Sequence, residues 1–406
     1  MAGAAGIGLC AAGGPAQAQE GQQGLEGDEP VAVFNQPREG LTPKGIDLGG
    51  FRLFPYATVS ETYDDNIFAD EDGEQSDFIT ALTAGARLRS EWSRHDFVFD
   101  ARVRHEKFLD NDEQDRTEYF LRPSVRFDLG SRDTAEINAE HSRQTVGRDD
   151  PEDDGDDDPT QFNRFEIGGE YINRVNRLFF GINANAQRDD YFTSGDNDRD
   201  RDEFRFGLPI GYEVSALTDV QIEPFVRRRD FDQDNSDGDD RDSLATGALL
   251  GIDTEISPLV DVNFDIGFIH NNFDNDDFDS RIDLIFGGEA IWYVTPRTTL
   301  IGRASRRDLA TSTSSASSKA QTSAEFEVQQ ELQRDLLFGV RLQYINDDFH
   351  DTDRNDDRAI GALSLEYLMN RNFSLVGDVR HEERWSNLEG EDFSRNLVTV
   401  GLRMRY

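Results

Sequence analysis

From Phe51 to the C-terminus, apolar and polar residues alternate along the chain in segments of roughly a dozen residues. In residues 260–268 every second residue is apolar, and the residues between them are Asp, Asn, Asp and Gly. Residues 97–103 and 178–186 follow a similar rule. Successive side chains of a β-strand point to opposite faces. The pattern therefore predicts strands that have one apolar and one polar face.

The breaks between these segments alternate between very short ones and long, mostly acidic ones. Short breaks fall at residues 93–95, 130–132, 174–176, 215–217, 256–258, 294–296, 333–334 and 370–371, and long ones at 147–160, 193–201, 232–240, 310–320 and 386–392. Bacterial outer-membrane barrels have short periplasmic turns, longer extracellular loops and an even number of strands. We count about eighteen strands, which returns both termini to the periplasm. The predicted fold is an all-β, transmembrane, antiparallel up-and-down β-barrel over residues 51–406.

The last predicted strand is a second indication of an outer-membrane barrel. Every other residue from Val398 to Tyr406 is apolar, and the chain ends on the aromatic Tyr406. This ending resembles the signal by which bacterial outer-membrane barrels are recognised for insertion, with Gly401, Met404 and Tyr406 at its characteristic positions. The resemblance implies the barrel assembly machinery as a partner.

The overall composition, taken alone, resembles that of a disordered acidic protein rather than a barrel. The chain has 406 residues and a net charge of −40, with a mean hydropathy of −0.68, values that disordered acidic proteins share. However, 29 Phe and 10 Tyr are too many for a solvated tail. No stretch approaches the ~20 apolar residues of a membrane-spanning helix, and the acidic balance excludes a nucleic-acid binder. A soluble β-sandwich or β-solenoid shows the same alternation, but the long strands and the aromatic ending favour a barrel in contact with outer-membrane lipids and lipopolysaccharide.

The N-terminal region lacks this alternation. Residues 1–18 read as a signal peptide that ends at the small-x-small site Ala16-Gln17-Ala18, although the basic start of such a peptide is missing, which leaves the position of the true start codon open. The sole cysteine, Cys10, lies in this leader, so we expect no disulfide. Residues 19–50 are rich in Gly, Gln and Pro. We expect a flexible periplasmic segment that is too short to form a globular plug.

The polar face of the strands is rich in both Arg and carboxylates. The expected lumen-lining residues are Arg87, Arg89, Asp100, Arg102, Arg104, Glu118, Arg122, Arg126, Glu136, Glu140, Glu166, Arg205, Glu223, Arg227, Asp265, Glu325, Glu327, Arg341, Asp378, Arg380 and Arg403. Such charges are costly on the lipid face, where Arg at the midplane costs about 2–4 kcal/mol. They predict a lattice of ion pairs along the wall, a charged permeation path that selects solutes by sign, or both.

A barrel of this size is wide enough for an aqueous channel unless something fills it. None of the loops is expected to be long enough to fold deeply into the lumen. The sequence thus predicts a channel but not its cargo.

Metal-binding and catalytic motifs are weak. Residues 232–240 begin like a calcium loop, but the glycine is displaced and no Glu closes the loop, so we expect no metal site and no cofactor. The Arg-His-Glu triplets at 104–106 and 380–382, and His141 beside Ser142, place each histidine on the apolar face. No nucleophile, base and orienting carboxylate are spaced for catalysis, so we do not expect an enzyme.

Residues 59–68 (VSETYDDNIF), the Ser76-Asp77-Phe78 strand start and the turn at residues 90–95 (SEWSRH) resemble the opening of the Putative beta-barrel porin 2 family. The resemblance implies an outer-membrane barrel of Gram-negative, largely alphaproteobacterial, origin. Some members of the family are encoded near exopolysaccharide genes, which implies a link to polymer export or surface attachment.

Two hypotheses for function follow. The first is a porin-like channel for passive transport across the outer membrane, including a conduit for an exopolysaccharide system. The second is a non-conducting structural barrel that anchors or organises surface material through its acidic loops.

Overall fold

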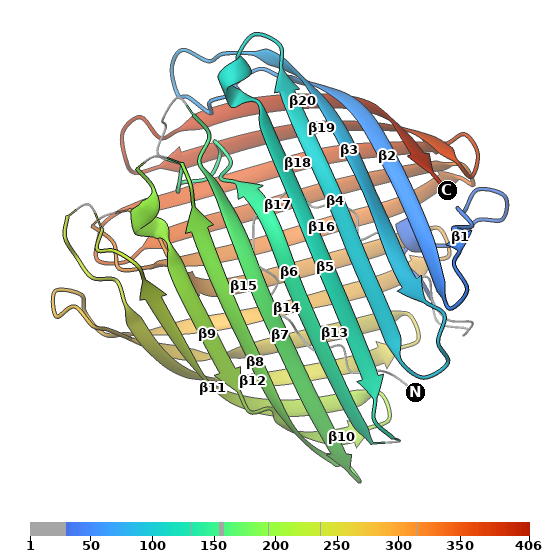
Figure 1. Cartoon of the computed structure of the whole chain (residues 1–406), viewed down its shortest axis with the longest axis horizontal. Helices are drawn as coiled ribbons and strands as arrows, with labels where there is room; N and C mark the ends of the chain where they lie inside the picture. The colour runs from blue at the N-terminus through green and yellow to red at the C-terminus, as the bar shows by residue number, and fades with distance from the viewer. Residues whose placement is uncertain (1–29, 131, 154–157, 194, 236, 314) are drawn as a thin grey trace.

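The computed structural model describes residues 30–406 except for residues 131, 154–157, 194, 236 and 314. The predicted signal peptide lies outside the described residues. The strands form one antiparallel sheet that closes on itself through pairing of β2 with β20, from Tyr56 opposite Arg405 to Asp64 opposite Leu397. Figure 1 shows the resulting barrel, in which strands from both ends of the chain lie side by side at the closing seam.

The elements follow the predicted order of strands and breaks. Their bounds are β1 (Ile46–Asp47), β2 (Phe51–Asp64), β3 (Asp77–Ser90), β4 (Asp96–Phe108), β5 (Arg116–Asp128), β6 (Asp133–Thr145), β7 (Gln161–Val175), β8 (Leu178–Tyr191), β9 (Arg201–Gly207), β10 (Ile210–Ser215), β11 (Thr218–Phe231), β12 (Ser243–Ser257), β13 (Val260–Phe273), β14 (Arg281–Thr295), β15 (Thr298–Leu309), β16 (Lys319–Gln333), β17 (Leu336–Phe349), β18 (Asn355–Leu368), β19 (Phe373–Ser386) and β20 (Phe393–Arg405). The described residues also form three short 3-10 helices: η1 (Val33–Asn35) precedes β1, η2 (Asp112–Gln114) follows β4 and η3 (Asn197–Arg199) follows β8.

The barrel wall has eighteen strands. β1 is a two-residue extension that pairs only with β2. β9 and β10 are two parts of one wall strand, because both pair with β8 and both pair with β11 in one continuous register. Pro209 lies at their junction and has no N–H to donate to the ladder. The count from the sequence is confirmed. No helix among the described residues is long and apolar enough to span a membrane.

The two faces of the wall differ as the alternation predicted. On β20, Val400, Met404 and Tyr406 are about half exposed on the outer face (61%, 51% and 58%). Buried or half-buried polar residues occupy the alternate positions, where Arg395 and Arg403 form ion pairs. A barrel of this kind buries its polar face inside and leaves its apolar face outside.

The N-terminal segment is the first departure from expectation. Residues 31–42 lie against the inner face of β15 to β18 near the short turns. Val33 is fully buried and packs with Leu337 and Leu368, and its N–H donates to Thr299 Oγ1 at 3.2 Å. Arg38 forms an ion pair with Glu331 at 3.1 Å. We expected a flexible lead-in, but these residues occupy part of the barrel interior instead. A few apolar and polar contacts hold these residues against the wall, and they do not form a globular core of their own.

Candidate functional site: the barrel interior and its constriction

In the loop between β6 and β7 (residues 146–160), the described residues 146–153 fold into the barrel. Its carboxylates contact β16, β18 and β20, which the strand order places across the barrel from β6 and β7. The expectation that no loop reaches deep into the lumen was therefore wrong. Fifteen extended residues span about 50 Å, so a loop of this length can reach in and return over about 25 Å, and long basic side chains bridge the remainder.

Asp149 holds the first contact across the lumen. Its carbonyl oxygen accepts a hydrogen bond from Arg358 Nη1 at 2.9 Å. Its carboxylate lies 3.4 Å from the same guanidinium and 3.3 Å from Arg395 Nη2. Arg395 also pairs with Glu382 of β19. One loop residue thus bridges two strands of the opposite wall.

Glu152 holds the second contact. Lys319 Nζ lies 2.9 Å from its carboxylate, and Thr311 Oγ1 donates to the same group at 3.0 Å. Only 4% of the Lys319 side chain is exposed, so this ammonium is buried together with its carboxylate partners. The loop returns to its own side through Arg148, which donates to Gln114 at 3.1 Å and pairs with Asp153 at 3.0 Å.

A neighbouring loop adds to this cover. Arg241, between β11 and β12, is fully buried and donates to the backbone oxygens of Thr311 and Asp198, each at 2.7 Å. Its guanidinium lies 4.4 Å from the centre of the Phe231 ring. The outer mouth is therefore covered by loops that are tied to one another by basic side chains.

The basic partners of Asp149 and Glu152 determine the pH range in which the loop stays docked. Burial alone would raise the pKa of Asp149 and of Glu152, but Arg395 and Arg358 lower the pKa of Asp149 to about 2, and Lys319 lowers the pKa of Glu152 to about 2. A carboxyl group whose pKa is lower in the folded state stabilises that state above its unfolded pKa of about 4, and loses this contribution as the pH falls through the folded value.

We therefore expect the loop to stay docked from pH 8 to about pH 5 and to be released only as the pH falls from about 4 towards 2. A spin label on Asp158→Cys, an exposed loop position, measures this as a rise in label mobility. Release near pH 6 would contradict the assignment, because neither carboxyl group titrates there. The same label at Leu388→Cys, in the β19–β20 loop, controls for general unfolding.

Below the constriction, the predicted inward residues form many ion pairs. Arg87 pairs with Asp100 at 2.6 Å, Arg122 with Glu140 and Arg205 with Glu223, both at 2.5 Å. Arg341 lies 3.6 and 3.5 Å from Glu325 and Glu327, which also contact Arg303. Other predicted residues contact partners that the sequence had not singled out: Arg89 contacts Asp96, Arg104 contacts Glu106, Arg126 contacts Asp128, Arg227 contacts Asp308, Arg380 contacts Glu382, Arg403 contacts Glu366, Glu118 accepts from Thr145 N–H, and Glu166 accepts from Asn185.

Six predicted residues, Arg102, Glu118, Glu136, Glu166, Asp265 and Asp378, have no ion pair within the described part of the chain. The guanidinium of Arg102 stacks on Phe120 at 4.6 Å, and its buried Nη1 makes no hydrogen bond to the described residues. Glu136 lies opposite another carboxylate, Glu170, in the β6–β7 register. The inner face thus has a basic stretch on β3 to β5 and an acidic stretch that starts at β6.

The residues that dock the loop were missed from the sequence. Lys319, Arg358 and Arg395 each lie near the outer start of a strand, on the inward face. Their only sequence signal is a group of basic residues at the outer ends of three C-terminal strands. Nothing along the chain pairs them with residues 149–152.

The segment that carried the family resemblance forms a tight outer turn. Asp64 Oδ1 accepts the N–H of Asn66 at 3.0 Å, and the Asn66 amide donates to the backbone oxygen of Asp70 at 2.8 Å. Asn66 also donates to Ser394 O on β20 at 3.2 Å. These polar side chains thus stabilise the turn and join it to the closing seam.

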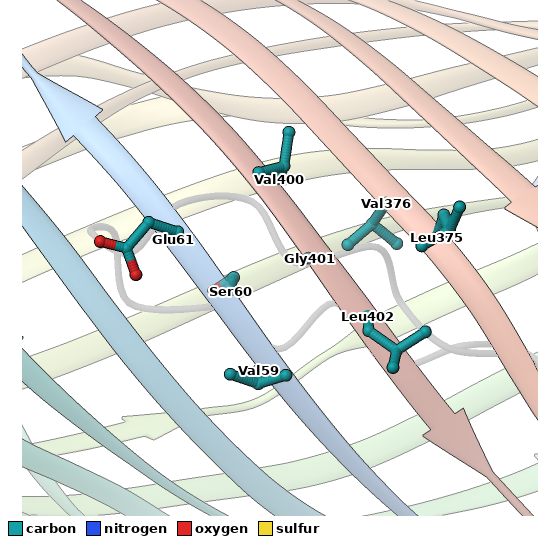
Figure 2. Close-up of a pocket in the computed structure, with 8 residues that line it drawn as sticks. All are labelled: Val59, Ser60, Glu61, Leu375, Val376, Val400, Gly401 and Leu402. Atoms are coloured by element: carbon teal, nitrogen blue, oxygen red, sulfur yellow. The ribbon is translucent and has the colours of Figure 1, made fainter.

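The proposed assembly signal lies at the same seam. Gly401 occupies a tight position, since a Cβ there would lie 3.0 Å from Ser60 Cβ and 3.1 Å from Val376 Cγ2. Figure 2 shows Gly401 between β2 and β19, in a shallow hollow of about 430 Å³ that Val59, Leu375 and Leu402 border. The backbone N–H of Tyr406 donates to Pro55 O at 3.2 Å. Glycine here allows the first and last strands to approach closely.

The histidines of the two Arg-His-Glu triplets face outward. His105 hydrogen-bonds to Thr117 and His381 to Asn396, each at 2.9 Å across neighbouring strands. His141 contacts Tyr119 Oη at 3.0 Å rather than its neighbour Ser142. In the acidic loop at 232–240, Asn235 Oδ1 accepts the N–H groups of Asp237 and Asp239. These contacts account for the motifs as local structure.

Comparison with known proteins gives a family. The model of the Putative beta-barrel porin 2 family matches residues 39–406, which is nearly all of the described chain. The chain belongs to this family. The turn at Asp64–Asn66 and the seam described above are therefore features of a porin-like barrel. No curated protein matches this porin-family chain significantly in sequence.

The chain is also similar, at low identity, to several solved outer-membrane proteins. The outer membrane protein OpdK of Pseudomonas aeruginosa is 11% identical, with a TM-score of 0.44 over 87% of this chain and 99% of that one. OccAB3 of Acinetobacter baumannii is 10% identical, with a TM-score of 0.45 over 88% and 99%. The FrpB iron transporter of Neisseria meningitidis is 7% identical, with a TM-score of 0.46 over 89% and 82%.

Proposed function

We propose that this protein is a passive outer-membrane channel for small charged solutes, in which the loop at 146–160 forms the constriction. The observation that carries the proposal is a closed eighteen-strand wall whose interior is lined by ionised side chains, in a chain of a porin family. A barrel of this width admits water where side chains do not fill it. Charged rings along a pore select solutes by sign.

The distribution of charge supports selection rather than a uniform lining. Arg102 has a free donor on the basic stretch, while Glu136 and Glu170 face one another on the acidic stretch. Because β4 to β7 are neighbours in the wall, a solute that passes along them experiences a field that changes sign between β5 and β6. Zwitterions and small ions that orient in this field are the expected cargo class.

A link to exopolysaccharide export has less support from the side chains. Sugar chains are commonly bound on free aromatic faces, and the inward aromatic residues that the alternation of the strands indicates include Phe120, Phe179 and Phe225. Each of these rings is covered by a guanidinium, from Arg102, Arg174 and Arg205, at 4.5–4.8 Å. We therefore favour small solutes over a polymer.

The experiment that tests the proposal is single-channel recording of the refolded protein in a planar bilayer under a salt gradient. Stable open steps are the expected result. If verifiably folded protein shows no conducting steps, the channel proposal is overturned. The second candidate, a non-conducting barrel that organises surface material, is then favoured. That candidate has an observation of its own, because the interior is occupied at one end by the loop and at the other by residues 31–42.

Arg102→Ala should shift the selectivity towards cations, on the order of twofold in the permeability ratio, because it removes the cationic side chain whose Nη1 has no hydrogen-bond partner among the described residues. The reversal potential under a salt gradient measures this shift. Arg188→Ala is the control, since Arg188 pairs with Asp232 on the outer face of the rim. An unchanged reversal potential in Arg102→Ala would mean that this side chain does not line the open path.

A further inference from the structure

Three side chains from separate parts of the chain meet inside the barrel near its outer mouth. They are Asp283 of β14, Asp308 of β15 and His350, which follows β17. One donor atom of each lies within 4.8 Å of the others. Asp308 and His350 are buried and Asp283 is half-buried.

Two of these donor atoms have no hydrogen-bond partner. His350 Nε2 and Asp283 Oδ2 are both shielded from solvent, and neither makes a hydrogen bond to the described residues. They lie 3.7 Å apart, and only 8% of the His350 side chain is exposed. Buried polar atoms are nearly always satisfied. A buried imidazole nitrogen and a carboxylate oxygen that face one another without a bond therefore point to a missing ligand between them.

Asp308 is held in a fixed orientation by its neighbours. Its Oδ1 accepts hydrogen bonds from Asn271 Nδ2 at 3.1 Å and Ser318 Oγ at 2.9 Å. Its Oδ2 accepts from Arg227 at 2.5 Å. Outer partners of this kind orient the carboxylates of metal sites. Arg227 also competes for the charge of Asp308, so we expect affinity in the micromolar range rather than that of a closed structural site.

We propose that His350, Asp283 and Asp308 bind one divalent transition-metal ion of the zinc type, with water in the remaining position. Two carboxylate oxygens and one imidazole nitrogen suit zinc, whereas calcium and magnesium prefer oxygen alone. Ligand atoms around tetrahedral zinc are about 3.4 Å apart, so the donors move inward by about 1 Å on binding. The acidic loop at 232–240 offers only oxygens and does not provide this combination.

The site would tie together the loops of the outer mouth. The backbone N–H of His350 donates to Ser318 O at 2.9 Å, and Ser318 Oγ donates to Asp308. The same loop carries Thr311, which holds Glu152 of the constriction. A bound ion would therefore join β14, β15 and the β17–β18 loop, and stabilise the surface on which the constriction loop docks.

The test is zinc binding by the refolded full-length protein in detergent after removal of metal with a chelator. Zinc alone is the probe, titrated calorimetrically with excess calcium present to occupy the acidic loops. We expect one zinc per chain, and at least a tenfold loss of affinity in both His350→Ala and Asp283→Asn. His381→Ala is the matched control, because His381 is exposed and bonded only to Asn396, and it should bind as the parent does. Heat-modifiable mobility in a gel shows that each variant is folded.

Cobalt substitution gives a second readout. Tetrahedral cobalt with a nitrogen ligand should show visible absorption bands in the parent, and these should be absent in His350→Ala. Absence of zinc binding by folded parent protein would overturn the proposal, as would equal binding by the parent and both site variants. None of these measurements requires conduction, so a failure of the zinc proposal can be distinguished from a failure of the channel proposal.

Discussion

Replacing residues 148–159 with a short Gly-Ser linker should raise the single-channel conductance by at least about twofold, because an eighteen-strand bore is limited by what fills it. The loop crosses to the opposite wall, where Lys319 and Arg358 hold Glu152 and Asp149. Removing it clears the space that residues 149–152 occupy beside these two basic side chains. The wall itself should persist, since β6 and β7 pair with each other over their whole length. Planar-bilayer recording measures the change.

A milder variant separates the charge of the loop from its bulk. Asp149→Asn with Glu152→Gln keeps the loop length but removes its ion pairs, and it should give frequent steps between the parent and the widened conductance. Asp158→Asn is the matched control, as Asp158 is an exposed residue of the same loop. If the linker variant conducts like the parent protein, the loop is not the constriction and residues 31–42 become the next candidate.

Deleting Tyr406 should abolish most assembly into the outer membrane while synthesis continues. Tyr406 is 58% exposed on the outer face at the end of β20, where the assembly machinery that we propose as a partner can reach it. Its loss removes the side chain that this recognition requires, while most of the β20 ladder with β2 remains. Heat-modifiable mobility of protein from isolated membranes measures the folded fraction.

Tyr367→Ala is the matched control, because Tyr367 is also an exposed aromatic residue at the same end of the barrel, on β18. It should assemble normally. The truncated chain should still refold in detergent without any machinery, which separates loss of recognition from loss of stability. Normal membrane assembly of the truncated protein would contradict the role of the terminal aromatic.

The wall of the barrel was predictable because its rules are local. Alternation has a period of two, so the face of Arg87 or Val400 follows from its neighbours, and the turns at 174–176 and 256–258 follow from interruptions in that period. The cross-lumen contacts have no such rule. Asp149 and Arg358 lie 209 residues apart, and only the closed barrel brings them together. The same holds for Asp283, Asp308 and His350, whose spacing resembles no metal motif.

The prediction that no loop reaches deep into the lumen rested on loop length, and it was wrong. No loop, residues 147–160 included, was expected to be long enough to fold deeply into the lumen. The bore is narrow enough for a loop of that length to cross half of it, and arginine and lysine side chains cover the rest. Asp149 and Glu152 are half-buried beside cations rather than dispersed in solvent. Charge composition alone does not separate these two arrangements.

The docking of the loop on Lys319, Arg358 and Arg395 also sets an order of events during biogenesis. Those residues belong to β16, β18 and β20, which lie on the other side of the barrel from β6 and β7. The constriction therefore cannot form until the C-terminal strands have been added and the seam is shut. In an unfinished barrel the acidic loop lacks the three basic side chains on which it docks. The pore is therefore narrowed at the same stage at which the wall is completed.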